Sequence, residues 1–453
     1  MAKIGIRILF IITIIFLLIF SIIFNLFKCY LISNYLGVIC ILFYLLYSFL
    51  YRTNYFLFNI LLIIYIFSNI IGVFLIEVFN KEIYLVELLM KGEQIGSTSL
   101  IVISHILFLE TTYLIFIRSN KYNKYLNFKY NYKRNIIINF LVIFFMLILA
   151  YLYFEIIKDG TSLSHHVNKF QYQQRFMNFI ELKLSNLLWV FPIILGYIFF
   201  QKQRKYSLII YALVNMYFLF IGQKFSFFII GFYYFFLNKI TEVNKTNKKI
   251  FFIISFLSIF LTILVLFQYK NNYSQKSWEE IFLHFFGRIA QQGQLWWATY
   301  MKTVDKNILN FNKIVDELKL MFYEKEELIL NTGIYKIMFL VAPKNIVIGA
   351  YNRGIRYAFS TQASFLYYFS WIGLLLVQII YGFIYGFILK NIKECLKKNK
   401  LITLILFSRI YLYANQFYLQ SDFYKILSVK MFIVYIIIFL ISKLEEKYCI
   451  KKI

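Results

Sequence analysis

The sequence is poor in the residues that soluble proteins use for turns, crosslinks and surface charge. Its 453 residues include two prolines and four cysteines, and charged residues make up 15% of the chain against 61% hydrophobic residues. A soluble domain with so few charges could not cover its apolar side chains. With a mean hydropathy of +0.69, the composition predicts an all-α protein that crosses a membrane many times.

The cysteine spacing argues against disulfide and metal sites, and the placement of the basic residues argues against nucleic-acid binding. Cys29, Cys40, Cys395 and Cys449 show no Cys-x-x-Cys spacing, so we expect no disulfide framework, zinc site or other metal site, and no cofactor. Acidic residues number 21 against 48 basic residues, which gives a net charge of +27. The basic residues lie mostly in short links between apolar runs. We therefore interpret this charge as membrane topology and not as nucleic-acid binding.

Twelve apolar runs are predicted to span the membrane, and the basic links orient them. If the chain crosses twelve times, all strongly basic short links fall on one face, which the positive-inside rule places in the cytoplasm together with both termini. The predicted spans are 4–24, 31–50, 56–76, 99–117, 135–154, 184–200, 206–221, 225–237, 250–267 and 365–389, followed by two more before a basic tail.

One segment of mixed polarity, here called the island, interrupts this pattern. The island covers residues 269–362 and separates spans one to nine, within 1–268, from spans ten to twelve, within 363–453. Long loops escape the charge rule, so its mixed charges agree with a place outside the membrane. We expect chemistry where the island meets the membrane.

The start of the island combines a helix signal with a stripe of polar side chains. The S-x-x-E sequence from Ser277 to Glu280 fits a capping box and precedes apolar residues at helical spacing. Glu280, His284, Arg288 and Gln292 follow at intervals of four, which places a carboxylate, an imidazole and a guanidinium on one face of an amphipathic helix. The first three are candidate catalytic groups. The alternative is a solvated helix face with an ordinary ion pair.

Further cations lie in segments that are predicted to be external. Candidate binding residues are His165 and Arg175 in the loop 155–178, Lys224 in the turn after the seventh span, and Arg353 with Arg356 just before the tenth span. We expect Arg353 and Arg356 to share a face if their segment is helical. The alternative for both is snorkelling at the membrane interface.

Three ionisable residues are predicted inside the membrane. Arg409 lies in the middle of span eleven and shares a helical face with Gln416 and Gln420, while His105 and Glu110 lie in span four. Ionisable groups in a bilayer cost several kcal/mol unless they are paired or hydrated, so they are functional candidates. The structural alternative is an ion pair between Arg409 and Glu110.

The arrangement resembles the repeat-unit polymerases of O-antigen and capsule synthesis (Wzy-type) in bacterial inner membranes. The resemblance covers nearly the whole chain. It rests on the number of spans, the external loop after span five, the Gly222-Gln223-Lys224 hairpin and the large loop between spans nine and ten. The sequence Tyr172-x-x-Arg175 and residues 354–360 are also similar. The resemblance implies glycosyl transfer on the outer side of the cytoplasmic membrane.

In such a reaction, a glycan on undecaprenyl pyrophosphate is moved onto a new lipid-linked repeat unit of O-antigen, part of lipopolysaccharide, or of a capsule. The reaction needs cations at the pyrophosphate, a base and aromatic surfaces for sugars. The resemblance assigns the cation role to Arg175, Lys224, Arg288, Arg353 and Arg356, with Arg409 as a lipid-phosphate contact. It assigns the base role to His284, Glu280 or His165, and sugar stacking to Trp296 and Trp297.

Two alternative functions remain open at this point. An O-antigen ligase shares the donor and the large loop with a polymerase. A lipid-linked oligosaccharide flippase also has about twelve spans, but the island argues against it. The partners that the resemblance implies are the lipid-linked oligosaccharide and membrane lipids, with a chain-length regulator and a flippase left open and no nucleic acid.

Overall fold

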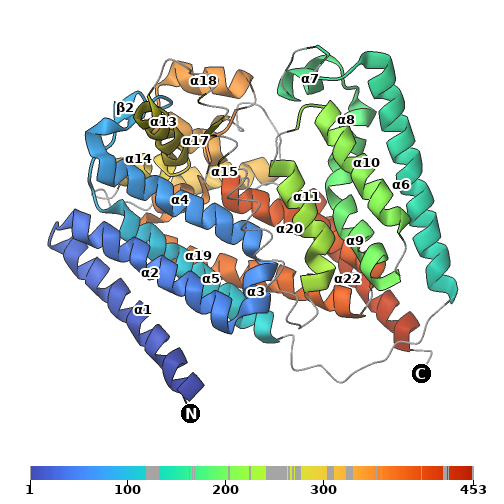
Figure 1. The fold of residues 1–453 in the computed structure, drawn as a ribbon, viewed down its shortest axis with the longest axis horizontal. Coiled ribbons are helices and arrows are strands. Elements are labelled where there is room, and N and C mark those ends of the chain that lie inside the picture. The colour runs from blue at the N-terminus through green and yellow to red at the C-terminus, as the bar shows by residue number, and fades with distance from the viewer. Residues whose placement is uncertain are drawn as a thin grey trace. The chain divides into compact units, whose positions relative to one another are not determined.

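A computed structural model shows an almost entirely helical chain (Figure 1). It describes residues 2–118, 132–162, 164–165, 167, 169–202, 205–223, 226–240, 263, 266–267, 270, 277–303, 311–322, 330–353, 355–358, 360–398, 400–421, 426 and 428–450. Within these ranges the strands are β1 (Tyr84–Leu85) and β2 (Met90–Lys91), which pair in antiparallel fashion. The all-α prediction is confirmed for the described residues.

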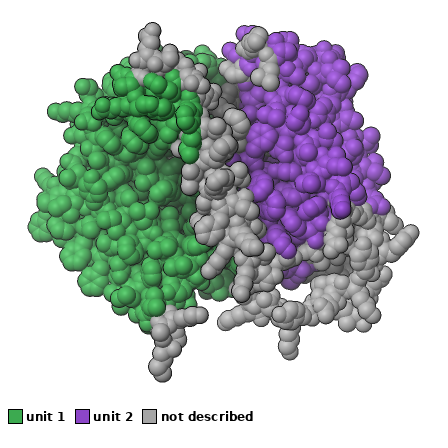
Figure 2. Space-filling model, in the orientation of Figure 1, with its two compact units in different colours: residues 1–118, 244–390, 410–440 green, residues 119–243, 391–409, 441–453 purple. Residues whose placement is uncertain are grey.

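The chain forms two compact units, which Figure 2 shows in different colours. Unit 1 contains residues 1–118, 244–390 and 410–440, and unit 2 contains residues 119–243, 391–409 and 441–453. Three helices supply residues to both units: α19 (Ser360–Lys398), α20 (Leu401–Gln420) and α22 (Val429–Ile450).

The remaining helices belong to one unit each. Those of unit 1 are α1 (Ala2–Leu26), α2 (Tyr30–Tyr51), α3 (Thr53–Phe58), α4 (Ile60–Phe79), η1 (Asn80–Glu82), α5 (Ser97–Ile117), α13 (Trp278–Ala290), α14 (Gln294–Thr303), α15 (Phe311–Phe322), α17 (Gly333–Val341) and α18 (Lys344–Asn352). Those of unit 2 are α6 (Tyr132–Asp159), α7 (Lys169–Arg175), α8 (Phe179–Leu187), η3 (Leu188–Val190), α9 (Phe191–Lys202), α10 (Tyr206–Phe220) and α11 (Ser226–Ile240).

Seven helical segments in the described part of the chain are long and apolar enough to cross a membrane. They are Gly5–Leu26, Tyr30–Tyr51, Ile60–Glu82, Ser97–Ile117, Asn139–Asp159, Phe179–Phe200 and Thr361–Lys398, and α10 and α11 are shorter apolar helices. The protein is therefore a multi-pass membrane protein. The predicted ninth span, 250–267, lies outside the described residues except for 263, 266 and 267.

Two predicted spans are interrupted in the structure. The run 56–76 is divided at Asn59, where φ is −110° and ψ is 9°, so α3 ends and α4 begins there. The run 365–389 lies inside α19, which contains a kink at Ser370 with φ 59° and ψ −175°. Hydrophobicity predicted these spans, but it carries no information about a local backbone angle.

The predicted turn after the seventh span is a feature of unit 2. Gly222 has a φ of +77°, a conformation that favours glycine, and it follows shortly after α10. Next to it, the backbone N–H of Ser162 donates to the carbonyl of Phe220 at 2.8 Å. The loop 155–178 and this turn, which we predicted to lie on the same side of the membrane, are therefore adjacent.

A buried carboxylate holds the start of α5 against α4 and α2. The side chain of Glu77, on α4, is 1% exposed. One of its oxygens accepts hydrogen bonds from Ser97 N at 2.7 Å and Ser97 Oγ at 2.6 Å, and the other accepts from Thr98 Oγ1 at 3.3 Å and from Asn34 Nδ2. The residue before α5, Gly96, has no side chain to cap the helix. Glu77 therefore supplies the negative charge and the acceptors that a helix N-terminus requires.

We expect Glu77→Ala to lower the free energy of unfolding by about 3 kcal/mol, because several buried donors lose their acceptor. Glu77→Gln keeps one acceptor oxygen and should cost less. Thermal unfolding of the detergent-solubilised protein measures both effects. Glu82→Ala, which removes an exposed carboxylate from η1, is the matched control. Equal melting temperatures for Glu77→Ala and the control would contradict the capping role.

The orientation of the spans can be tested with a native cysteine. Cys29 is exposed in the turn between α1 and α2, a turn that we predict to be external, and Cys40 and Cys395 are buried. A membrane-impermeant maleimide should label intact cells, and Cys29→Ser should abolish this labelling. Cys449 lies in the tail that we predict to be cytoplasmic, so it is changed to serine as well. Adding Lys397→Cys to Cys29→Ser with Cys449→Ser should restore labelling only after permeabilisation. Labelling of this triple variant in sealed cells would contradict the predicted topology.

Candidate functional site

The predicted site residues are divided between the two units. Unit 1 contains Glu280, His284, Arg288, Trp296, Trp297, Arg353 and Arg356, whereas unit 2 contains His165, Arg175 and Arg409. Lys224 lies outside the described residues. Most of the predicted site residues, including those on the island, therefore belong to unit 1.

Helix α13 confirms the capping box but shortens the polar stripe. Ser277 Oγ accepts from Glu280 N at 3.2 Å, and the Glu280 carboxylate accepts from Ser277 N at 2.9 Å. The helix ends at Ala290, so Gln292 lies beyond it, and the carbonyl of Gln292 accepts from Asn69 Nδ2 at 2.7 Å. The expectation that Gln292 continues the stripe was wrong, because the chain turns at that point. Glu280 is engaged in capping its own helix.

The tryptophan pair anchors α14 to the membrane helices. Trp296 and Trp297 are both 0% exposed. Their indole N–H groups donate to Ser97 O at 3.1 Å and to Glu93 O at 2.9 Å. A Cβ atom on Gly293 would overlap the backbone of Val73, so glycine permits α14 to begin this close to α4. Because both rings are inside unit 1, they have no face open to a sugar, and we assign them to packing.

Arg353 and Arg356 do not share a helical face. Helix α18 ends at Asn352, and residues 355–358 are not helical. Arg353 is exposed and its Nε donates to Gly349 O at 2.9 Å. The Arg356 guanidinium lies 5.4 Å from the ring centroid of Tyr335 and donates to Gln420 Oε1 at 3.4 Å. We predicted that the two arginines share a face if their segment is helical. The segment is not helical as far as Arg356, so that condition is not met.

A carboxylate that the sequence analysis did not select lies between α13, α14 and the segment before α19. Glu87 is in the turn of the β1–β2 hairpin and is partly buried. Its side chain accepts a hydrogen bond from Gln294 Nε2, and its backbone carbonyl accepts one from the Tyr357 hydroxyl at 2.9 Å. Arg288, on α13, is close enough to act on the Glu87 charge. We call these four residues the Glu87 cluster.

The environment of the Glu87 cluster changes the proton affinity of Glu87 and Tyr357. Burial raises the pKa of Glu87, and the hydrogen bond from Gln294 and the charge of Arg288 only partly oppose this shift. Burial, followed by the charge of Glu87, raises the pKa of Tyr357. A carboxylate with a raised pKa is a stronger base than an ordinary one, which suits it to accept a proton from a substrate hydroxyl. Arg288 is exposed, so its guanidinium can meet an anionic ligand beside that carboxylate.

A buried polar chain connects the island to the membrane helices of unit 1. His105, on α5, is fully buried. Its Nδ1 lies 2.6 Å from the Tyr418 hydroxyl, and its Nε2 lies 3.3 Å from Asn69 Oδ1. Asn69 in turn donates to the carbonyl of Gln292. Both ring nitrogens of His105 thus have partners, which explains how an imidazole is accommodated at this depth.

The structure shows one partner for each of the two other ionisable membrane residues. Glu110 forms an ion pair with Arg52 at 2.5 Å. Arg409, in unit 2, donates from Nη1 to the carbonyl of Asn186 at 3.0 Å. The partner that the structure shows for Glu110 is Arg52, from the α2–α3 junction, and the alternative of an Arg409–Glu110 pair stays a prediction. A role for Arg409 at a lipid phosphate remains a prediction.

The loop 155–178 of unit 2 is held by local contacts. The His165 ring stacks on Phe176 with a centroid distance of 4.2 Å, and its Nε2 lies 2.6 Å from Asp159 O. The Tyr172 hydroxyl donates to Gly160 O at 2.6 Å, and burial raises the pKa of Tyr172 to about 12. Arg175 is exposed at the end of α7. Within the described ranges, no three His, Cys, Asp or Glu side chains come together as metal ligands do.

The raised pKa of Glu87 predicts a pH dependence of stability. The folded protein keeps the Glu87 proton above the ordinary pKa of 4.5, where the unfolded chain has released it. This contribution is present below the ordinary pKa and is lost as the pH rises through the raised pKa. As the pH rises from below 4.5 through the raised pKa, the melting temperature of the wild type should therefore fall relative to that of Glu87→Gln.

The matched control for this pH series is Glu93→Gln, which removes an exposed carboxylate from the same loop. Its melting curve should keep the pH dependence of the wild type. Parallel pH profiles for the wild type and Glu87→Gln would show that Glu87 titrates alike in the folded and unfolded states.

Comparison with known proteins covers a C-terminal range with residues of both units. Residues 329–436 match a family of unknown function (DUF6418), a range that runs from before α17 into α22. It includes Arg353 and Arg356 but neither Glu87 nor Arg288. No curated protein and no solved structure matches the chain. The chain is thus a multi-pass membrane protein with a DUF6418 region.

Proposed function

We propose that the protein transfers glycosyl units between lipid-pyrophosphate-linked oligosaccharides on the outer side of the cytoplasmic membrane, as a polymerase of O-antigen or capsule repeat units. The observation that carries this proposal is the Glu87 cluster. There, a partly buried carboxylate with a raised pKa lies within electrostatic range of the exposed Arg288 guanidinium. Glycosyl transfer from a pyrophosphate requires that pairing of a proton acceptor and an anion-binding group.

Each member of the cluster has a role in the proposed reaction. The acceptor hydroxyl attacks the anomeric carbon of the donor sugar and its proton passes to the Glu87 carboxylate. The bond from that carbon to the pyrophosphate breaks, and Arg288 stabilises the charge on the leaving group. Gln294 and Tyr357 position Glu87 through its side chain and its backbone carbonyl.

The position of the island supports chemistry on the outer side. The hydrogen bonds that hold the island reach Ser97 O at the start of α5, Glu93 O just before it and Gln420 at the end of α20. Our topology prediction places all of these points on the external side. Arg353 and Arg356 belong to the same unit, so we keep them as proposed substrate contacts.

An O-antigen ligase would use the same donor and the same chemical groups. The two activities differ in the acceptor and therefore in the product. Loss of a polymerase leaves single repeat units on the surface glycan, whereas loss of a ligase leaves polymer on the lipid carrier and none on its acceptor. The product pattern in a variant thus separates the two candidates.

We expect Glu87→Gln and Arg288→Ala each to reduce glycan chain extension by about 100-fold or more, because they remove the proton acceptor and a cation at the leaving group. Gel analysis of the surface glycan in the host should then show single repeats in place of a ladder. Immunoblots of membrane fractions report whether each variant is present at the wild-type level.

The matched control is Lys319→Ala, which removes another cation of the island. The Lys319 ammonium pairs with Asp316 at 3.3 Å on the exposed side of α15, and its loss should leave the ladder unchanged. Normal ladders in both Glu87→Gln and Arg288→Ala, at normal protein levels, would disprove the proposed site.

A further inference from the structure

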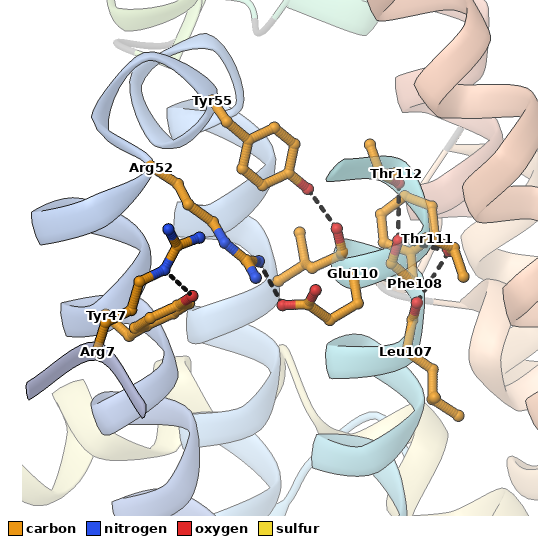
Figure 3. A network of polar contacts seen from close by, with 10 residues as sticks. Arg7, Tyr47, Arg52, Tyr55, Leu107, Phe108, Glu110, Thr111 and Thr112 are labelled. Atoms are coloured by element: carbon orange, nitrogen blue, oxygen red, sulfur yellow. Dashed lines mark hydrogen bonds and ion pairs between the residues drawn. The ribbon is translucent and has the colours of Figure 1, made fainter. Parts of the chain in front are cut away.

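A second charged cluster lies on unit 1 around Arg52 and Glu110 (Figure 3). Glu110 is 13 residues along α5 from Ser97, which corresponds to about 20 Å of helix. Here α5 meets the first turns of α1 and the junction of α2 and α3. We call the residues Arg7, Tyr47, Arg52, Glu110 and Tyr113 the arginine–tyrosine cluster. The positive-inside rule places it at the cytoplasmic end of these spans.

Arg52 is the buried member of the cluster. Its side chain is 9% exposed and its Nη1 lies 2.5 Å from Glu110 Oε1. The guanidinium is enclosed by two aromatic rings, 3.8 Å from the centroid of Tyr113 and 4.8 Å from that of Tyr47. Its Nε is buried and has no hydrogen-bond partner among the described residues. The single ion pair therefore leaves part of this guanidinium unsatisfied.

Arg7 adds a second guanidinium, which pairs with no carboxylate in the described part of the chain. Its Nε donates to the Tyr47 hydroxyl at 3.2 Å, so the ring that covers Arg52 also orients Arg7 (Figure 3). The Arg7 side chain is exposed on α1. Two guanidinium groups and one carboxylate give the cluster a net charge of +1. The Arg7 guanidinium has further N–H donors, which suit a bidentate anion.

The surroundings of Arg7 are apolar and exposed, as expected of a surface that faces lipid. Ile6 and Leu9, close to Arg7 on α1, are 49% and 63% exposed. An anion that binds beside these side chains would need an apolar part of its own. Phospholipids combine a phosphate with acyl chains, and basic sites between transmembrane helices on the cytoplasmic side bind anionic head groups.

We propose that the arginine–tyrosine cluster binds the phosphate of an anionic phospholipid in the cytoplasmic leaflet, through Arg7 and with the acyl chains along α1. The site is separate from the proposed glycosyl-transfer site and does not depend on that function. It would fix the N-terminal end of α1 beside α2, where Arg7 and Tyr47 meet. The ligand is the lipid and not free phosphate, since free phosphate makes no use of the apolar side chains around Arg7.

The test is binding of phosphatidylglycerol to the purified full-length protein, measured by native mass spectrometry from detergent. The wild type should retain phosphatidylglycerol in preference to phosphatidylcholine. Arg7→Gln should weaken this binding about fivefold, the equivalent of about 1 kcal/mol for one cation at a membrane surface. Arg7→Lys keeps the positive charge but loses the planar guanidinium, so its affinity for phosphatidylglycerol should lie between those of the wild type and Arg7→Gln.

The matched control is Arg118→Gln, which removes an exposed cation from the same end of α5, outside the cluster. Its affinity for phosphatidylglycerol should equal that of the wild type. Equal binding of the two lipids by the wild type, or equal losses in Arg7→Gln and Arg118→Gln, would overturn the proposal. Displacement of phosphatidylglycerol by millimolar inorganic phosphate would overturn the assignment of a lipid. If Arg7→Gln does not enter the membrane, Arg7→Lys with wild-type affinity refutes the bidentate contact.

Discussion

A carboxylate buried at the start of α5 is the constraint on which the rest of unit 1 depends. Glu77 satisfies the N-terminus of α5 from a neighbouring helix and, through Asn34, joins α2 to the same point. The carbonyl of Ser97, whose N–H and hydroxyl bind Glu77, accepts the indole N–H of Trp296. The island is thereby attached to the end of a membrane helix whose position is already fixed. Gln294, at the start of the same helix α14, then reaches Glu87.

The two ends of α5 show two solutions to the same physical problem. A carboxylate in a membrane protein must be satisfied, because an isolated charge in a low-dielectric medium costs several kcal/mol. Glu77 is surrounded by neutral donors and a helix N-terminus, whereas Glu110 is paired with a guanidinium. Neutral donors leave a site that contributes to structure alone. Glu110 neutralises one of the two guanidinium groups at its end of α5, and the charge of Arg7 remains, which is why we assign a ligand to that end.

The proposed chemistry uses a group that is neither exposed nor fully buried. A fully buried carboxylate such as Glu77 has its acceptor capacity taken by internal donors, and an exposed one has an ordinary pKa. Glu87 lies between these limits, held by Gln294 and near Arg288. The candidates chosen from helical spacing lack this combination, since Glu280 caps its own helix. Partial burial is a property of tertiary packing, and spacing along one helix does not report it.

The sequence by itself determined that this is an all-α, multi-pass membrane protein, where most of the helices run, and that α13 begins with a capping box. These features follow from local composition and periodicity, which act within one element. Only the tertiary structure decided that Trp296 and Trp297 are buried, that Glu110 pairs with Arg52 and that Glu87 accepts a hydrogen bond from Gln294. Each of these contacts is between elements that are far apart in the chain. Which contacts form depends on which helix ends pack together. Hydrophobicity places a helix in the membrane, but only packing selects its neighbours.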